Sequence, residues 1–84
     1  MIQFTIQHNE IQAHEGQELV GKIVFERTDN QLAILHTYAY QSGRGIGSML
    51  MQKAVEYAQE NNYNILPICS FAKKYLGERI GFSV

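Results

Sequence analysis

A glycine-rich connection between an extended apolar segment and a helical pattern constrains the fold of this chain most. The segment Leu32 to Tyr40 reads as a strand, and apolar residues from Ile46 to Asn61 recur with the period of a helix. Between them stands Gly43-Arg44-Gly45-Ile46-Gly47-Ser48. Glycines let the backbone approach a ligand, and the free N–H groups that begin a helix bind anions. The sequence therefore predicts a phosphate-binding turn with Arg44 adding charge, although a turn that needs only positive φ stays open.

Two well-known phosphate-binding motifs do not fit this turn. The dinucleotide fingerprint needs a third glycine one residue after Gly47, where Ser48 stands, and an acidic residue that ends the next strand. The nucleoside-triphosphate loop ends in Gly-Lys-Ser/Thr, and this turn lacks the lysine. A different phosphorylated ligand is therefore expected.

Length and composition predict one small domain, residues 1–84, in the cytoplasm. The net charge of −1 argues against nucleic-acid binding, which needs a basic face, and Lys73-Lys74 can serve only one or two phosphates. The lone Cys69 cannot form an internal disulfide, which favours a reducing compartment. No long apolar run or signal core predicts a membrane contact, and one cysteine with three scattered histidines makes no metal site.

Hydrophobic patterning predicts an α/β fold of the α+β type. Its order is four antiparallel strands, a helix, a parallel strand and a helix. The strands are expected around Ile2–Ile6, Ile11–His14, Glu18–Arg27, Leu32–Tyr40 and Ile65–Cys69, and the last helix around Phe71–Arg79, followed by a tail at Gly81–Val84.

The alternation within two of these strands predicts which side chains share a face. In the third strand Leu19, Gly21, Ile23 and Phe25 share one face, and in the fourth Leu32, Ile34, His36, Tyr38 and Tyr40 do so. Neither face of the fourth strand is strongly polar, so it is expected to be covered on both sides.

The succession of a strand, the segment Gln41-Ser42-Gly43-Arg44-Gly45-Ile46-Gly47-Ser48 and an amphipathic helix resembles the coenzyme-A pyrophosphate loop of the GNAT superfamily of N-acetyltransferases. More narrowly, His36-Thr37 before the loop and Pro67-Ile68-Cys69-Ser70-Phe71-Ala72-Lys73-Lys74-Tyr75 after the helix resemble a family of very short, single-domain members. The resemblance covers roughly residues 18–76. Ser42 stands where the superfamily usually has Arg or Gln. The segment from Thr37 to Gly43 is shorter than usual, which leaves open whether the strand keeps the β-bulge that splays it.

The resemblance implies that acetyl-CoA (coenzyme A) is the cofactor and that two parallel strands splay apart to bind its pantetheine arm. The diphosphate would meet the N–H groups of the loop, and one backbone N–H of the preceding strand would polarise the thioester carbonyl. The expected cofactor-binding residues are Tyr38, Ala39, Tyr40, Gly43, Arg44, Gly45, Ile46, Gly47, Ser48, Phe71, Lys73 and Lys74.

Three side chains are catalytic candidates, each with a structural alternative. Cys69 ends a strand beside the expected cleft and precedes a helix, a position that favours the thiolate form, and it could then carry the acetyl group transiently. Its structural alternative is to pack as a small hydrophobic side chain. His36 serves as a base or hydrogen-bonds across the sheet. Tyr75 protonates the departing thiolate, as tyrosines do in larger relatives, or packs the last helix.

Two functions from different classes follow. The first is an acetyl-CoA-dependent N-acetyltransferase that acts on a small amine or a protein amine. The second is a coenzyme-A-binding or interaction module without turnover, since the acceptor side of the fold is so reduced. The expected partners are acetyl-CoA and an unidentified amine, and the expected state is a monomer or weak homodimer.

Overall fold

The computed structural model describes residues 1–41 and 43–80, with side chains described as far as Leu76. Its elements have the order predicted from the sequence, with ends that differ by a residue or two. Ser42 and the expected tail at Gly81–Val84 lie outside the described residues. The elements are β1 (Ile2–Gln7), β2 (Glu10–Glu15), β3 (Glu18–Arg27), β4 (Gln31–Ala39), α1 (Ile46–Glu60), β5 (Asn64–Pro67) and α2 (Ser70–Ile80).

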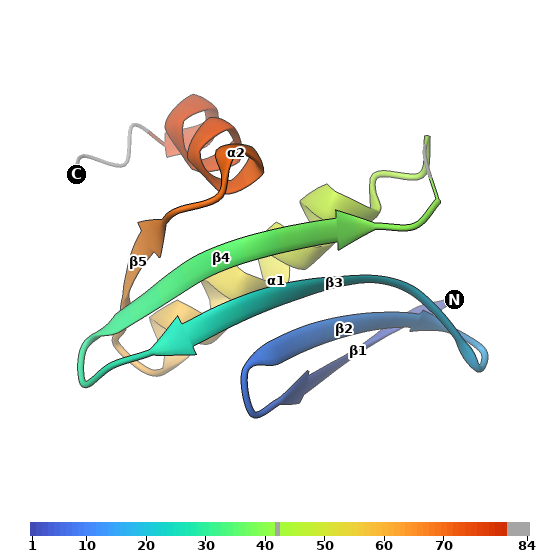
Figure 1. Cartoon of the computed structure of the whole chain (residues 1–84), viewed down its shortest axis with the longest axis horizontal. Coiled ribbons are helices and arrows are strands. Elements are labelled where there is room, and N and C mark those ends of the chain that lie inside the picture. The colour runs from blue at the N-terminus through green and yellow to red at the C-terminus, as the bar shows by residue number, and fades with distance from the viewer. Residues whose placement is uncertain (42, 81–84) are drawn as a thin grey trace.

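The five strands form one mixed sheet in the order β1-β2-β3-β4-β5. The first four are antiparallel neighbours, and β5 lies parallel to β4 after the α1 crossover, which confirms the predicted α+β fold. Helix α1 lies across one face of the sheet, and α2 follows β5 at the opposite side from β1 (Figure 1). The face turned away from α1 carries no helix in the described chain.

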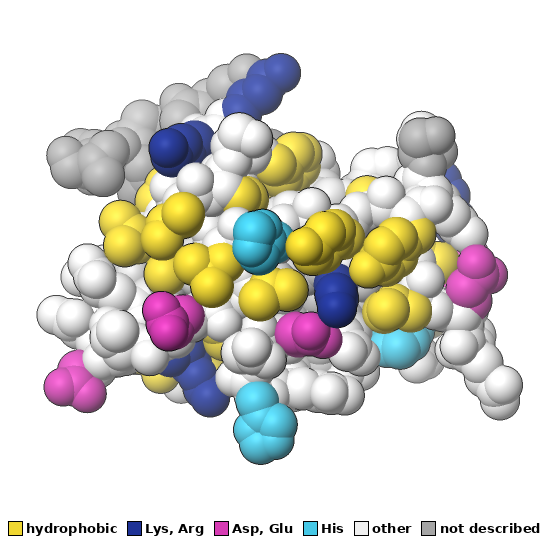
Figure 2. All heavy atoms as spheres, in the orientation of Figure 1, with side chains coloured by type: hydrophobic (Ala, Val, Ile, Leu, Met, Phe, Trp, Pro, Cys, Tyr) yellow, Lys and Arg dark blue, Asp and Glu magenta, His cyan; other side chains and the backbone are white. Residues whose placement is uncertain are grey.

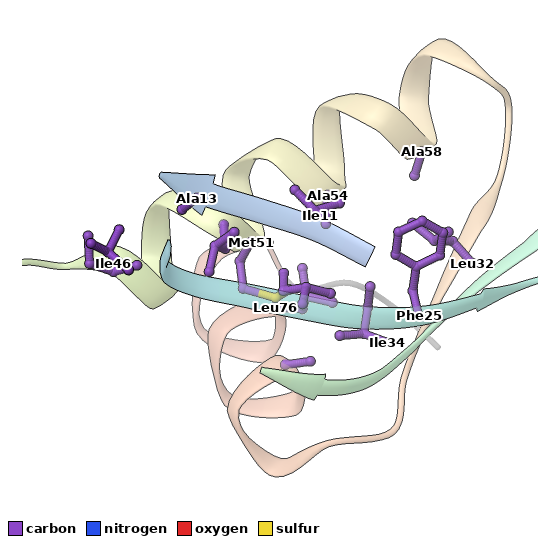
Figure 3. Close-up of a cluster of buried hydrophobic side chains, with 14 residues drawn as sticks. Ile11, Ala13, Phe25, Leu32, Ile34, Ile46, Met51, Ala54, Ala58 and Leu76 are labelled. Atoms are coloured by element: carbon purple, nitrogen blue, oxygen red, sulfur yellow. The ribbon is translucent and has the colours of Figure 1, made fainter. Parts of the chain in front are cut away.

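The core lies between α1 and the covered face of the sheet (Figure 3). An isolated helix of this length, 15 residues, is marginal in water, so α1 depends on burying its apolar stripe. Leu76 and Ala72 of α2 close the core at the β5 end. Its other buried members are Ile11, Ala13, Val20, Ile23, Phe25, Leu32, Ile34, Ile46, Leu50, Met51, Ala54 and Ala58.

Two β-bulges change which side chains share a face. The β2–β3 register shifts so that Val20 has no partner of its own, and the β3–β4 register shifts so that Leu35 has none. Each extra residue reverses the alternation beyond it. The predicted faces are therefore wrong in one part of β3 and in one part of β4. In β3, Leu19 pairs with His14 on the uncovered face, while Val20 is buried.

The bulge at Leu35 divides β4 into two parts. Leu32 and Ile34 lie in the core, whereas His36, Tyr38 and Tyr40 lie on the uncovered face and are exposed. The expectation that this strand is covered on both sides is therefore wrong for its second half. A β-bulge is therefore present in this strand at Leu35, before the Thr37–Gly43 segment on which the sequence left the question open.

A close approach of α1 to β3 depends on Gly21. A Cβ built on Gly21 would lie 2.6 Å from Ile46 Cγ2 and 2.8 Å from the backbone oxygen of Tyr38. The sequence pattern placed Gly21 on the same face as Ile23 and Phe25, and the structure shows that its missing side chain makes room for the first turn of α1.

Candidate functional site

Strands β4 and β5 begin as a parallel pair and then separate. The pairing runs from Gln31 with Asn64 to Ile34 with Pro67, and the backbone N–H groups of Ile68 and Cys69 both donate to the Ile34 oxygen, at 3.0 and 3.1 Å. Beyond this point β4 continues to Ala39 with β3 as its strand partner. The separation opens one edge of the second half of β4.

The backbone of Thr37 and Ala39 faces the opened edge. The Tyr40 N–H donates to the Val20 oxygen at 2.9 Å, so it points toward β3. Because hydrogen-bonding direction alternates along a strand, Tyr38 also points toward β3, and Thr37 and Ala39 point the other way. Among the three residues expected to line the cleft, Ala39 is the one whose backbone is aimed into it.

Cys69 and Thr37 connect the two sides of this opening. The Cys69 Sγ lies 3.4 Å from Thr37 Oγ1 and accepts a hydrogen bond from the Ala72 N–H at 3.3 Å. The sulfur therefore occupies the N-cap place of α2, where a side chain satisfies an otherwise free N–H group. Thr37 belongs to the His36-Thr37 pair that precedes the loop, but it was not among the site residues predicted from the sequence. No local pattern indicates a contact between residues 32 positions apart.

The glycine-rich turn leads from the end of β4 to the start of α1. Gly43 and Gly45 have φ of 80° and 70°, and a Cβ on either would have nothing within 4 Å. Gly45 is the N-cap of α1, without a side-chain cap, and the Met49 N–H makes the first helical bond to its oxygen at 3.0 Å. Three N–H groups, those of Ile46, Gly47 and Ser48, therefore precede the first helical bond beside open space.

Gly47 has a packing function that differs from that of the other two glycines. A Cβ on Gly47 would lie 3.0 Å from the Cζ atom of Phe71, at the start of α2. The Phe71 ring in turn stacks on Tyr75, with centroids 6.2 Å apart. Gly47 therefore lets the beginnings of α1 and α2 come together at the mouth of the opening.

Arg44 is joined to the β2–β3 turn. Its guanidinium donates to both carboxylate oxygens of Glu15, at 2.6 and 3.0 Å, and to Gln41 Oε1 at 2.6 Å. This hydrogen-bonded pair raises the pKa of Arg44 and holds the pKa of Glu15 below its usual value. The expected positive charge of the turn is therefore balanced by Glu15, and the pair fixes the turn against a distant part of the sheet.

Acid should remove the link between Arg44 and Glu15. A carboxylate whose pKa is lowered in the folded state stabilises that state above its unfolded pKa, about 4.3, and the effect is lost as the pH falls through the lowered value. We expect Glu15→Gln to melt slightly below the parent protein at pH 7 and at the same temperature in strong acid. Thermal melts across this range measure the difference; a constant gap would contradict the assignment.

The candidates on β4 with aromatic side chains form a row on the uncovered face. The rings of His36 and Tyr38 lie 6.0 Å apart, Tyr38 stacks on Tyr40 at 6.3 Å, and Lys22 Nζ lies 5.8 Å from the Tyr38 ring centroid. Figure 2 shows this face, where hydrophobic side chains gather in a band around a histidine. Cys69, by contrast, contacts Thr37, which pairs with the core residue Ile23. The structure therefore does not bring His36 and Cys69 onto the same face.

The remaining candidates belong to α2. Lys73 and Lys74 are exposed in its first turns, and Tyr75 is half-buried against Phe71 and the core. Tyr75 therefore makes the packing contacts expected of its structural alternative, and these contacts do not test its role as a proton donor. The described residues contain no group of three or more His, Cys, Asp or Glu side chains that could hold a metal, and no helix among them could span a membrane.

Comparison with known proteins identifies the family. The model of the GCN5-related N-acetyl-transferase family matches residues 6–80, which is nearly the whole chain. The chain belongs to this family. The match includes the separating strands, the glycine-rich turn and the start of α2, so the features described above are those of a GCN5-related acetyltransferase fold.

A solved structure supports the same fold. The chain is similar to SA2161 from methicillin-resistant Staphylococcus aureus, a protein of unknown function described as a probable acetyltransferase, with a TM-score of 0.64 and 15% sequence identity. The match covers 89% of this chain and 61% of that one. No curated protein shows significant similarity to the sequence. This GCN5-related chain thus spans about three-fifths of the length of its structural relative.

Acetyl-CoA, which the family implies, fits these residues. Gly43 and Gly45 leave open space in which a Cβ would stand, next to the helix N–H groups that suit a diphosphate. The opened edge of β4 offers the backbone of Thr37 and Ala39, beyond the last residues that pair with β5, to an amide-containing chain. The two features adjoin along the chain, at the end of β4.

Proposed function

We propose that this chain is an acetyl-CoA-dependent N-acetyltransferase that acts on a small amine or a protein amine. The observation that carries the proposal is the separation of β4 from β5 directly beside an α1 start without a side-chain cap. Family membership supports acyl transfer, and the free thiol of Cys69 supports a reducing compartment such as the cytoplasm.

Acetyl-CoA supplies an activated acetyl group on a thioester. The N–H groups of Ile46, Gly47 and Ser48 would hold its diphosphate, and Gly43 and Gly45 would leave room for it. The Ala39 N–H, which points into the opening, is the group that would donate to the carbonyl oxygen of a bound thioester and stabilise negative charge on it. Phe71 closes the mouth of the site above Gly47.

The acceptor amine must lose a proton before it attacks. His36 is exposed on the uncovered face beside Tyr38, and it is the side chain of this part of β4 best suited to accept that proton. An amine that approaches the opening from the uncovered face would pass His36, while the Cys69 sulfur lies against Thr37. Direct attack by the amine needs no covalent intermediate and is the route that we propose.

A module that binds coenzyme A without turnover is the second candidate. The observation that favours it is the separation of His36, Cys69 and Tyr75 onto the uncovered face, the opening and α2. Incubation with acetyl-CoA and a panel of amines, with release of the coenzyme-A thiol as readout, separates the two candidates. A thermal shift with coenzyme A but no thiol release from any amine would favour the binding module. A protein that shows no thermal shift and no thiol release would reject both candidates.

Replacement of Lys73 or Lys74 by alanine should weaken coenzyme-A binding by about two- to fivefold each, because exposed charge pairs contribute little. The loss should shrink at high salt, since screening already weakens the attraction in the parent protein. Titration calorimetry at two ionic strengths measures it. Lys53→Ala, on α1 beside β1, is the control and should bind normally. A loss that is independent of salt would assign the lysines to packing.

Substitution of Cys69 should separate its capping role from a chemical one. Cys69→Ser keeps an acceptor for the Ala72 N–H, whereas Cys69→Ala leaves that N–H group without its cap and should cost about 1 kcal/mol of stability. We expect Cys69→Ser to keep both coenzyme-A affinity and turnover. Chemical denaturation and the thiol-release assay measure these effects. Loss of turnover in Cys69→Ser, with an acetyl adduct on the parent protein that hydroxylamine removes, would show the covalent route instead.

A further inference from the structure

Strand β1 forms an edge of the sheet that lacks the usual protection. It pairs with β2 along its whole length, from Ile2 with Glu15 to Gln7 with Glu10, and no other described strand pairs with it. Its sequence, IQFTIQ, contains no charged residue and no proline, and its pairing with β2 has no bulge. Natural proteins generally protect their edge strands with charged residues, prolines or bulges, because free N–H and C=O groups invite pairing with another chain.

The opposite edge of the same sheet is protected. Strand β5 is four residues long, ends in Pro67, and is followed directly by the turn into α2. Proline removes a donor from the edge, and a short strand offers few partners. The contrast between the two edges indicates that β1 is open for pairing in a way that β5 is not.

We propose that β1 pairs antiparallel with β1 of a second copy of this chain, which joins the two five-stranded sheets into one. The proposal is independent of acetyl transfer, because β1 lies at the opposite edge of the sheet from the β4–β5 opening. A twofold axis relates the copies, so the same surface is used on both.

The β1–β2 hairpin decides which backbone groups of β1 face outward. Gln7 and Glu10 close a turn of two residues, which makes them a hydrogen-bonded pair whose N–H and C=O groups point at each other. Hydrogen-bonding direction alternates from there, so the backbone groups of Ile2, Phe4 and Ile6 point away from β2.

One register satisfies both the backbone and the side chains. With the twofold axis at Phe4, that residue lies opposite the partner's Phe4, and Ile2 lies opposite the partner's Ile6. Residues directly opposite each other in a sheet point to the same face, so this register keeps both α1 helices on one side of the joined sheet. The outward backbone groups of these even-numbered residues then meet each other.

A groove beside the edge gives the second copy apolar surface to cover. Ile6 is 46% exposed, and the groove has a volume of about 240 Å³. Its lining includes one lysine and two glutamates, and Lys53 pairs with Glu56 of the same helix at 3.5 Å, so part of this charge is already neutralised within each copy. The lining residues are Phe4, Ile6, Lys53, Glu56, Tyr57 and Glu60.

Sedimentation velocity of the full chain over a range of concentrations tests the association. We expect a species with twice the chain's mass of 9.6 kDa, and the fraction of protein in this species should rise with concentration. Ile6→Lys should abolish it by placing a charge opposite the partner's Ile2. Thr5→Gln, which changes a side chain on the uncovered face of the same strand without adding charge to the edge, is the control and should associate normally. A monomer at every concentration, or a dimer that withstands Ile6→Lys, would overturn the proposal.

A cysteine scan tests the register. Phe4→Cys should form an intermolecular disulfide under mild oxidation, because opposite residues of a hydrogen-bonded pair lie about 5.5 Å apart between Cα atoms. Gln3→Cys should not, since it lies opposite the partner's Thr5. The parent protein, with Cys69 its one cysteine, is the control. Cross-linking of Gln3→Cys in preference to Phe4→Cys would overturn this register.

Discussion

Replacement of Gly21 by alanine should destabilise the protein by about 2 to 3 kcal/mol, the cost of overpacking a well-packed core. The new Cβ would stand 2.6 Å from Ile46 Cγ2, 3.1 Å from Leu50 Cδ1 and 2.8 Å from the Tyr38 backbone oxygen. The last of these cannot move without disturbing the β3–β4 pairing. For a domain of this size the melting temperature should fall by about 10 to 20 °C, which calorimetry measures.

The sign of this effect distinguishes contact from propensity. In an open strand, glycine to alanine is favourable by about 0.5 to 1 kcal/mol, because alanine loses less conformational freedom on folding. Gly16→Asn is the control: Gly16 has a φ of 62° and nothing within 4 Å of its Cβ position, and asparagine tolerates positive φ. We expect little change there. A stabilised Gly21→Ala protein would show that α1 can shift away from β3 without cost.

The order of elements could be predicted because local signals agree with the final fold. Alternation marks Ile2, Phe4 and Ile6 as one face of a strand, and α1 repeats its buried residues with helical period. A strand, helix and strand in succession form a right-handed crossover, which made β5 parallel to β4. None of these inferences needs a contact between distant residues to be known.

The bulges at Val20 and Leu35 could not be predicted in this way. A bulge depends on the partner strand, and one extra residue reverses the alternation on which the prediction rests. For this reason His36, Tyr38 and Tyr40 were assigned to the face of Leu32 and lie on the other one.

In the candidate site too, local features could be predicted from the sequence and contacts between distant segments could not. The glycine-rich turn is local, and its position between β4 and α1 agrees with the prediction. The contacts of Arg44 with Glu15, of Gly47 with Phe71 and of Thr37 with Cys69 join segments far apart in the sequence. Each of these required the folded arrangement, because each depends on how two elements approach.

Gly45→Val should reduce coenzyme-A affinity at least tenfold, about 1.4 kcal/mol, while the protein remains folded. Gly45 has a φ of 70°, where a β-branched residue is strained, and it caps α1 at the place where the first N–H groups of the helix are free. Valine would both distort the backbone of the turn and place a side chain in the open space beside it. Titration calorimetry measures the affinity, and circular dichroism checks the fold. Gly47 is a poorer test, because its substitution also displaces Phe71.

Gly45→Asn separates the two effects of the valine. Asparagine adopts positive φ with little strain, so the turn should keep its shape while a side chain enters the open space. If Gly45→Asn also loses affinity, the ligand lies against Gly45, as the proposal requires. If it binds normally while Gly45→Val does not, the shape of the turn matters and the space beside Gly45 does not. Normal binding by both variants would remove the turn from the site and leave the opening between β4 and β5 as the place to search for the ligand.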